Sequence, residues 1–179
     1  MNVPFDGSYW VVPGKFLAGC YPGAKRLDEA GRKLAALLDA GIRCVVSLME
    51  EDVTDWSGDG FEGYQEDIGI LAEERGLQVE CLRMPIPNTS IPTFGTMRRI
   101  LDEIDGAINR GKPVYVHCWG GKGRAGTVVG CWLMRHGIAT ADGVLPMIQE
   151  LRKDDPAWFE PSPENERQRW MVKSWKAGE

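Results

Sequence analysis

Apolar residues along the chain follow two periods, one typical of strands and one typical of helices. Short apolar or β-branched runs predict strands at residues 9–12, 15–18, 42–48, 78–84 and 113–118. Apolar residues three and four positions apart predict helices at residues 26–40, 63–75, 97–108, 128–134, 140–153 and 163–176. Because strands alternate with helices, we expect a single α/β domain over residues 1–179, with a central, mostly parallel sheet flanked by helices.

Residues that commonly begin or end helices and strands support the boundaries of these predicted elements. Glycines follow three of the predicted helices, at Gly41, Gly76 and Gly137. Thr93 is a candidate N-cap for the helix that contains Met97 to Ile108. Residues 50–62 are acidic and glycine-rich and predict a loop, and prolines enforce a second loop at Pro85, Pro87 and Pro92. The apolar face of the first helix is predicted to comprise Leu27, Ala30, Leu34, Leu37 and Leu38.

Composition narrows the classes of function. The 179 residues carry a net charge of −5, which argues against a nucleic-acid partner. The five cysteines are widely spaced, without a C-x-x-C pair, so neither a metal site nor a disulfide framework is expected. A reducing cytoplasmic location is the expectation. No apolar run approaches the ~20 residues that span a membrane.

The segment with the clearest chemistry joins the last predicted strand to a helix. It reads His117-Cys118-Trp119-Gly120-Gly121-Lys122-Gly123-Arg124. A helix N-terminus and nearby cations favour the thiolate, the nucleophilic form of a cysteine such as Cys118. The glycines let successive N–H groups turn inward and form an anion nest, to which the helix dipole adds. Arg124 can hold two phosphate oxygens. The pattern therefore predicts a phosphate site with Cys118 as nucleophile.

The spacing Cys118-x5-Arg124 after His117 resembles the signature of the protein tyrosine and dual-specificity phosphatases, most closely the small atypical dual-specificity type. Further motifs of that type occur in order. They are Trp10 to Gly14, Val46-Ser47-Leu48, Ile86-Pro87-Asn88 and Glu164 to Gln168. The resemblance implies hydrolysis of phosphate monoesters through a phosphocysteine intermediate on Cys118. The partner would be a phosphorylated protein or a small phosphate ester, with no cofactor and no metal.

The resemblance also implies supporting roles. His117 would brace the loop and help to lower the pKa of the thiol, and Gln168 would help to place the hydrolytic water. Lys122 resembles a lysine that phosphoinositide phosphatases carry in this loop, although a solvated surface lysine is an equal interpretation. Trp119 either lines the pocket or packs beside it. Trp119 to Arg124 would together bind the phosphate.

Two positions depart from the family pattern. Asn88 stands where the family has an Asp that protonates the leaving oxygen, and an amide cannot do this. Ala125 stands where a hydroxyl normally follows the Arg, although Thr127 fits the pattern. We therefore expect slow turnover. A displaced acid could compensate, with Glu51, Asp52, Asp55 and Asp59 as candidates. Alternatively, the protein is a phosphate-binding pseudophosphatase, or the sequence is that of an engineered substrate trap.

A dinucleotide-binding module is the rival interpretation. Gly121, Gly123 and Gly126 match G-x-G-x-x-G between a strand and a helix. That fold requires an acidic residue at the end of the next strand about 20 residues on, but residues 138–153 predict a helix. Only 53 residues follow Gly126, which is too few for the rest of that fold. The substrate identity and the oligomeric state are not predicted by the sequence.

Overall fold

The structure is a computed structural model that describes residues 2–51 and 63–179. Five strands and six helices occupy these ranges. In chain order they are β1 Ser8–Val12, β2 Phe16–Gly19, α1 Leu27–Asp39, β3 Cys44–Ser47, α2 Gln65–Glu73, β4 Glu80–Arg83, α3 Phe94–Asn109, β5 Val114–His117, α4 Arg124–Arg135, α5 Val144–Leu151 and α6 Glu166–Ser174. The predicted elements are all present, with ends that differ by up to four residues: α3 and α4 are longer than predicted, and α5 and α6 are shorter.

The strands form one sheet in the order β1-β2-β5-β3-β4. β1 and β2 pair antiparallel as a hairpin, while β2, β5, β3 and β4 run parallel to one another. The predicted α/β class with a mostly parallel sheet is therefore confirmed. β5 lies between β2 and β3, so the residue that follows it emerges from the middle of the sheet.

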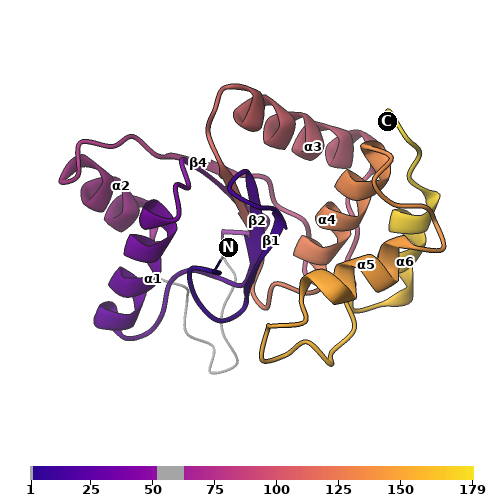
Figure 1. The fold of residues 1–179 in the computed structure, drawn as a ribbon, viewed down its shortest axis with the longest axis horizontal. Helices are drawn as coiled ribbons and strands as arrows, with labels where there is room; N and C mark the ends of the chain where they lie inside the picture. Colours follow the sequence, from indigo (N-terminus) through magenta and orange to yellow (C-terminus); the bar gives the residue numbers. More distant parts are fainter. Residues whose placement is uncertain (1, 52–62) are drawn as a thin grey trace.

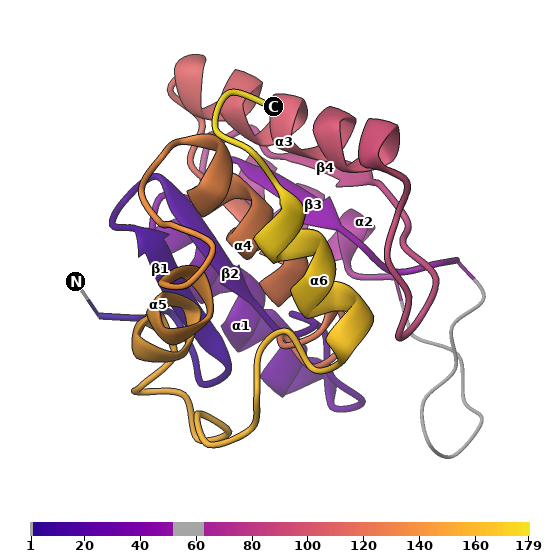
Figure 2. The same ribbon diagram turned by 90° about the vertical axis from the view of Figure 1, so that its right-hand side faces the viewer.

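Helices cover both faces of this sheet. α1 and α2 pack on one face, and α3, α4, α5 and α6 pack on the other (Figure 1). Seen from the α4–α6 side, these helices lie in front of the strands (Figure 2). Successive strand residues point to opposite faces, so that Val116 faces the α3–α6 core and Tyr115 the α1–α2 core. Both apolar layers thus anchor the central strand β5.

The cap and core predictions mostly hold. The Thr93 hydroxyl accepts a hydrogen bond from Thr96 N at 3.1 Å, which is the expected N-cap of α3. Ala30, Leu34, Leu37 and Leu38 are buried in α1 as expected. Leu27 is 74% exposed, so its placement in the apolar face was wrong. Leu27 is the first residue of α1, and this end of the helix leaves its side chain in solvent. No described helix is long and apolar enough to cross a membrane.

Candidate active site

The carboxyl ends of three parallel strands meet where Cys118 emerges. His117 at the end of β5 is in register with Gly19 of β2 and with Ser47 of β3. Leu48 N donates to His117 O at 2.9 Å, which extends the pairing one residue beyond β3. Cys118 is the next residue and is only 3% exposed. The nucleophile expected from the sequence therefore lies at the edge of the sheet where ligands bind in parallel α/β folds.

The phosphate loop, residues Cys118–Arg124, is attached to the segment after β2. Tyr21 N donates to Trp119 O at 2.9 Å, and Cys20 forms an isolated β-bridge with Gly120. Gly121 has φ +70°, and a Cβ atom there would lie 2.7 Å from Cys20 N. Only glycine fits this position, both for its backbone conformation and for the close approach of the neighbouring chain.

Arg124 begins α4 and is buried, with 3% of its surface exposed. Its Nη1 donates to Ile86 O at 3.2 Å and to Leu48 O at 3.4 Å. Within residues 2–51 and 63–179, its Nε and Nη2 donate no hydrogen bond, which leaves them for an anion. Gly123 precedes α4 and supplies no side-chain cap, so the leading N–H groups of the helix are also available. The loop thus holds the groups that bind a phosphate dianion.

His117 is a neutral side chain that contacts the backbone of the phosphate loop. Its Nδ1 lies 3.2 Å from Cys118 O, and its Nε2 lies 2.6 Å from the hydroxyl of Tyr64. Because a carbonyl oxygen can only accept, Nδ1 carries the proton and Nε2 accepts the Tyr64 proton. Burial lowers the pKa of His117 to about 4, with smaller contributions from the positive charges of Arg124 and Arg83, and the bond to Cys118 opposes this. His117 therefore braces the loop near pH 7 but brings no positive charge to the thiol.

Tyr64 is a site residue that the sequence did not reveal. It stands just before α2 and is 3% exposed, and burial raises the pKa of its hydroxyl well above the usual value. The bond to His117 joins residues 53 positions apart. A lone tyrosine before a helix carries no sequence signal for such a contact.

Asn88 lies in the loop after β4, close to the strand ends. Its backbone N donates to Glu50 Oε2 at 3.3 Å, and both residues are exposed. The neighbouring Thr89 has φ +57°, and its carbonyl accepts from Asn165 Nδ2 at 2.9 Å. Glu50 was not among the candidate acids from the sequence, yet it contacts the position in question. Of the four candidates, Glu51 is described, and Asp52, Asp55 and Asp59 lie outside the described residues.

The segment before and within α6 packs against the phosphate loop. A Cβ atom on Gly123 would lie 2.2 Å from Glu164 Oε1 and 3.1 Å from Gln168 Nε2, so both side chains contact the loop directly. Gln168 is fully buried and donates to Ser90 O at 3.4 Å, while its Oε1 has no hydrogen-bond partner among the described residues. Thr127 donates its hydroxyl to Gly123 O at 2.7 Å. The Thr127 proton is thus bonded to the loop backbone and not to the sulfur.

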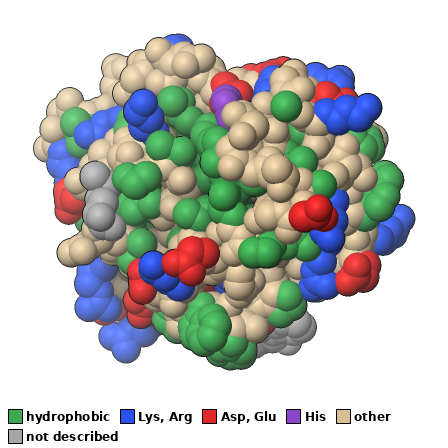
Figure 3. Space-filling view, turned by 45° about the vertical axis from the view of Figure 1, so that its right-hand side comes forward, with side chains coloured by type: hydrophobic (Ala, Val, Ile, Leu, Met, Phe, Trp, Pro, Cys, Tyr) green, Lys and Arg blue, Asp and Glu red, His purple; other side chains and the backbone are tan. Residues whose placement is uncertain are grey.

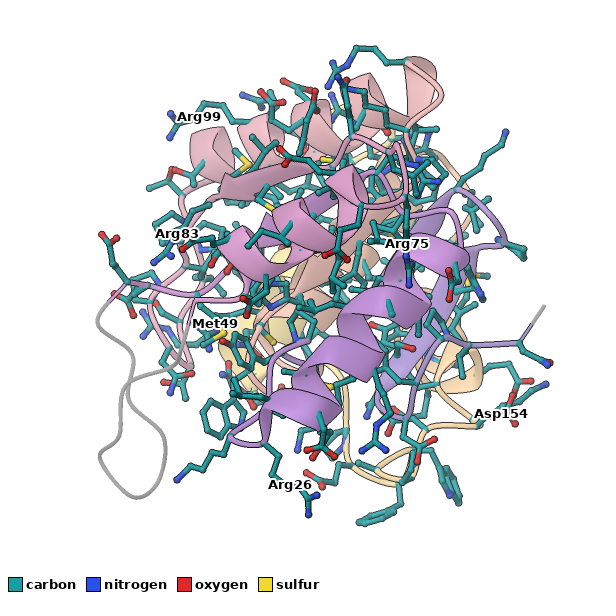
Figure 4. The ribbon with its side chains drawn as sticks, turned by 90° about the vertical axis from the view of Figure 1, so that its left-hand side faces the viewer. Arg26, Met49, Arg75, Arg83, Arg99 and Asp154 are labelled. Atoms are coloured by element: carbon teal, nitrogen blue, oxygen red, sulfur yellow. The ribbon has the colours of Figure 1, made fainter. Side chains whose placement is uncertain are left out.

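A pocket lies beside the loop at the ends of β3 and β4. Its lining includes Ser47, Met49, Glu50, Tyr64 and Arg83. Met49 and Arg83 lie on the same side of the molecule, next to the α1–α2 layer (Figure 4). The pocket places a positive and a negative side chain next to the residues that support His117.

The described residues lack the features that a dinucleotide-binding module or a metal site would require. After α4 the described chain continues into α5 and α6, without the strand that would carry a ribose-binding acid. Among the described residues, no three or more His, Cys, Asp or Glu side chains are grouped as metal ligands. The glycines of the G-x-G-x-x-G match instead shape the phosphate loop and its junction with α4.

The sheet, the loop after β5 and the buried Arg124 together define the fold of a cysteine-dependent phosphatase. The family model described as "PTP-SAK: Swiss Army Knife protein, DSP-PTPase phosphatase domain" matches residues 6–158. The chain belongs to this family, and the expected relationship to small dual-specificity phosphatases is confirmed. The contacts of Glu160, Glu164 and Gln168 lie beyond the matched range.

Individual relatives agree with this assignment. The chain is 29% identical over 152 residues to the human dual specificity protein phosphatase CDC14A, covering 80% of this chain and 22% of that protein. It therefore spans about a fifth of that relative. The active form of Tk-PTP has a TM-score of 0.67 at 25% identity, covering 95% of this chain and 96% of the other. PTPMT1 in complex with PI(5)P has a TM-score of 0.66 at 20% identity, with coverage of 95% and 94%.

Proposed function

We propose that this protein hydrolyses phosphate monoesters through a phosphocysteine intermediate on Cys118. The observation that carries the proposal is the placement of Cys118 at the end of β5, followed by a loop that ends in buried Arg124 at the uncapped start of α4. Charge stabilisation and positioning account for most of the catalysis of phosphoryl transfer, and this loop supplies both. The family assignment supports the same chemistry.

In the first step, the Cys118 sulfur attacks phosphorus. An S–P bond forms, the P–O bond to the leaving group breaks, and that oxygen takes up a proton. Arg124 and the loop N–H groups hold the equatorial oxygens on which charge is spread. In the second step, a water oxygen bonds to phosphorus, the S–P bond breaks, and inorganic phosphate and the Cys118 thiolate are released.

Gln168 positions the water of the second step. Its side-chain amide lies against Gly123, and its buried Oε1 accepts no hydrogen bond from residues 2–51 or 63–179. A buried acceptor without a partner costs free energy unless a water molecule satisfies it. A water bound there would lie next to the phosphorylated loop, as the second step requires.

Glu50 supplies the leaving-group proton in place of Asn88. An amide at position 88 has no proton to give at neutral pH. Glu50 reaches the backbone of that position, with Oε2 3.3 Å from Asn88 N. We expect Glu50→Gln to lower kcat on an aryl phosphate by about tenfold, at the low end of general-acid effects. The matched control is Glu73→Gln, an exposed residue at the end of α2. Equal loss in both variants would count against Glu50.

The substrates are phosphorylated proteins or small phosphate esters. The test of activity is phosphate release from an aryl phosphate by the purified protein. Cys118→Ser should abolish it, because a hydroxyl is a far weaker nucleophile than a thiolate. Cys81→Ser, on β4, is the matched control and should retain it. Activity that survives Cys118→Ser would refute the mechanism.

A phosphate-binding pseudophosphatase is the second candidate. Asn88 and Ala125 favour it, because both replace groups that the resemblance assigns to turnover. Calorimetry with inorganic phosphate distinguishes the two. Binding by the wild-type protein, without hydrolysis of an aryl phosphate at any pH between about 5 and 8, would select the pseudophosphatase.

A further inference from the structure

Lys122 is part of the phosphate loop, and its side chain lies along that loop. Its Cε is 3.5 Å from where a Cβ atom of Gly120 would stand, and the side chain is 23% exposed. Its ammonium group forms an ion pair with Glu160 Oε2. The sequence left two interpretations of Lys122, a lysine that binds the ligand and a lysine exposed to solvent, and neither describes an ammonium group that is paired with Glu160. Lys122 lies on the loop, but a carboxylate already neutralises it.

The position of Glu160 is fixed by its backbone. Glu160 O accepts from Arg152 Nη1 at 3.0 Å and from Gln149 Nε2 at 3.3 Å. Arg152 is fully buried and also donates to Asp155 Oδ2 at 3.0 Å and to Ala157 O at 3.1 Å. A buried arginine with these partners holds the segment 155–160 in one arrangement. The Glu160 carboxylate can therefore change without loss of the contacts that place it.

The same segment also holds the loop backbone at Lys122. Ser162 Oγ donates to Lys122 O at 2.9 Å. Lys122 is thus gripped at its carbonyl by Ser162 and at its ammonium group by Glu160. These two contacts restrict movement of the Lys122 ammonium group toward a bound ligand.

We propose that Glu160 is a specificity-determining residue, which acts as an internal counter-ion of Lys122 and disfavours substrates that carry further phosphate groups next to the reacting one. The inference rests on the proposed function of the phosphate loop. A ligand with one phosphate needs only Arg124 and the loop N–H groups. A ligand with adjacent phosphates would need the charge of Lys122 and would meet the carboxylate of Glu160 instead.

Neither the net charge nor the face of the molecule in Figure 3 offsets this effect. Positive and negative side chains are interspersed on the face of α4–α6 (Figure 3), and the net charge of the chain is −5. Attraction of polyanions by the wider surface is weak when charges of both signs alternate. The local pair of Lys122 and Glu160 therefore sets the preference.

The test compares the binding of orthophosphate and tripolyphosphate by calorimetry at low salt. The proteins are the wild type, Glu160→Gln, Lys122→Gln and the double variant. Glu150→Gln is the matched control, since Glu150 on α5 pairs with Lys153 and neither residue belongs to the loop. Binding needs no turnover, so the outcome is separate from the failure of hydrolysis. Circular dichroism checks folding, and Glu160→Ala replaces Glu160→Gln if that variant does not fold.

We expect Glu160→Gln to raise the affinity ratio of tripolyphosphate to orthophosphate at least fivefold. Lys122→Gln should lower the ratio, and the double variant should return to the wild-type value. A ratio within twofold of the wild type in Glu160→Gln would overturn the proposal. So would an equal rise in Glu150→Gln, or a double variant that keeps the full rise, because Glu160 would then act without Lys122.

Discussion

The buried His117 makes the stability of this protein sensitive to mild acid. Its pKa falls from 6.5 to about 4 on folding, chiefly because burial disfavours the charged imidazolium. Between pH 6.5 and pH 4, the imidazole of His117 is protonated in the unfolded chain but not in the folded protein. Stability is therefore highest above pH 6.5, and it falls as the pH drops toward 4.

The size of the effect follows from the same values. The difference of 6.5 − 4 = 2.5 in pKa corresponds to about 3 kcal/mol when one pKa unit is about 1.4 kcal/mol. Most of this is lost between pH 7 and pH 4.5, which gives an expected loss of about 2 kcal/mol from His117 alone. This loss is a large part of a typical protein stability of about 5–15 kcal/mol.

Urea unfolding followed by tryptophan fluorescence measures this loss, since the chain carries seven tryptophans. Carboxylates also titrate in this range, so the wild type is compared with His117→Asn, which can still donate to Cys118 O. The variant is expected to be less stable at pH 7, because it loses the Tyr64 contact, but to lose about 2 kcal/mol less between the two pH values. Equal losses in the two proteins, to within about 0.5 kcal/mol, would refute the reasoning.

Three further outcomes are expected. Asn88→Asp should raise the turnover of an aryl phosphate at least about tenfold in the Glu50→Gln background, where the proposed acid is absent, and no gain in steady-state kinetics would show that a carboxyl group at position 88 does not reach the leaving group. Gly121→Ala should abolish calorimetric phosphate binding, because its Cβ would meet Cys20 N at 2.7 Å at a positive φ; retained affinity would contradict this. Thr127→Val should lower the free energy of unfolding in urea by about 0.5–1.5 kcal/mol, since Gly123 O loses the Thr127 hydroxyl and keeps only the Thr127 backbone N as donor; an unchanged midpoint would contradict this.

Local signals explain what the sequence could predict. The apolar run that became β5, the glycines after it and the position of Arg124 are contiguous, so a short window identifies strand, loop and helix start. Thr93 likewise caps α3 through a bond to a residue three positions away. Such features depend on propensity and backbone geometry within a few residues, which a sequence shows directly.

Contacts between distant segments were not predictable in this way. The Tyr64 bond to His117, the Glu50 bond to Asn88 and the packing of Glu164 on Gly123 depend on how the layers approach one another. The exposure of Leu27 has the same origin, since helical spacing does not say where a helix first meets its sheet. Charged and polar residues with no local pattern acquire partners only in the folded chain.

The packing around the phosphate loop also limits how this loop can change in evolution. A side chain is excluded at position 121 by the backbone at Cys20, whereas at position 123 it would have to displace the carboxylate of Glu164. Position 120 meets only the flexible stem of Lys122, at 3.5 Å. Divergence of substrate preference among close descendants should therefore accumulate at positions 120 and 122, together with position 160, while position 121 remains glycine.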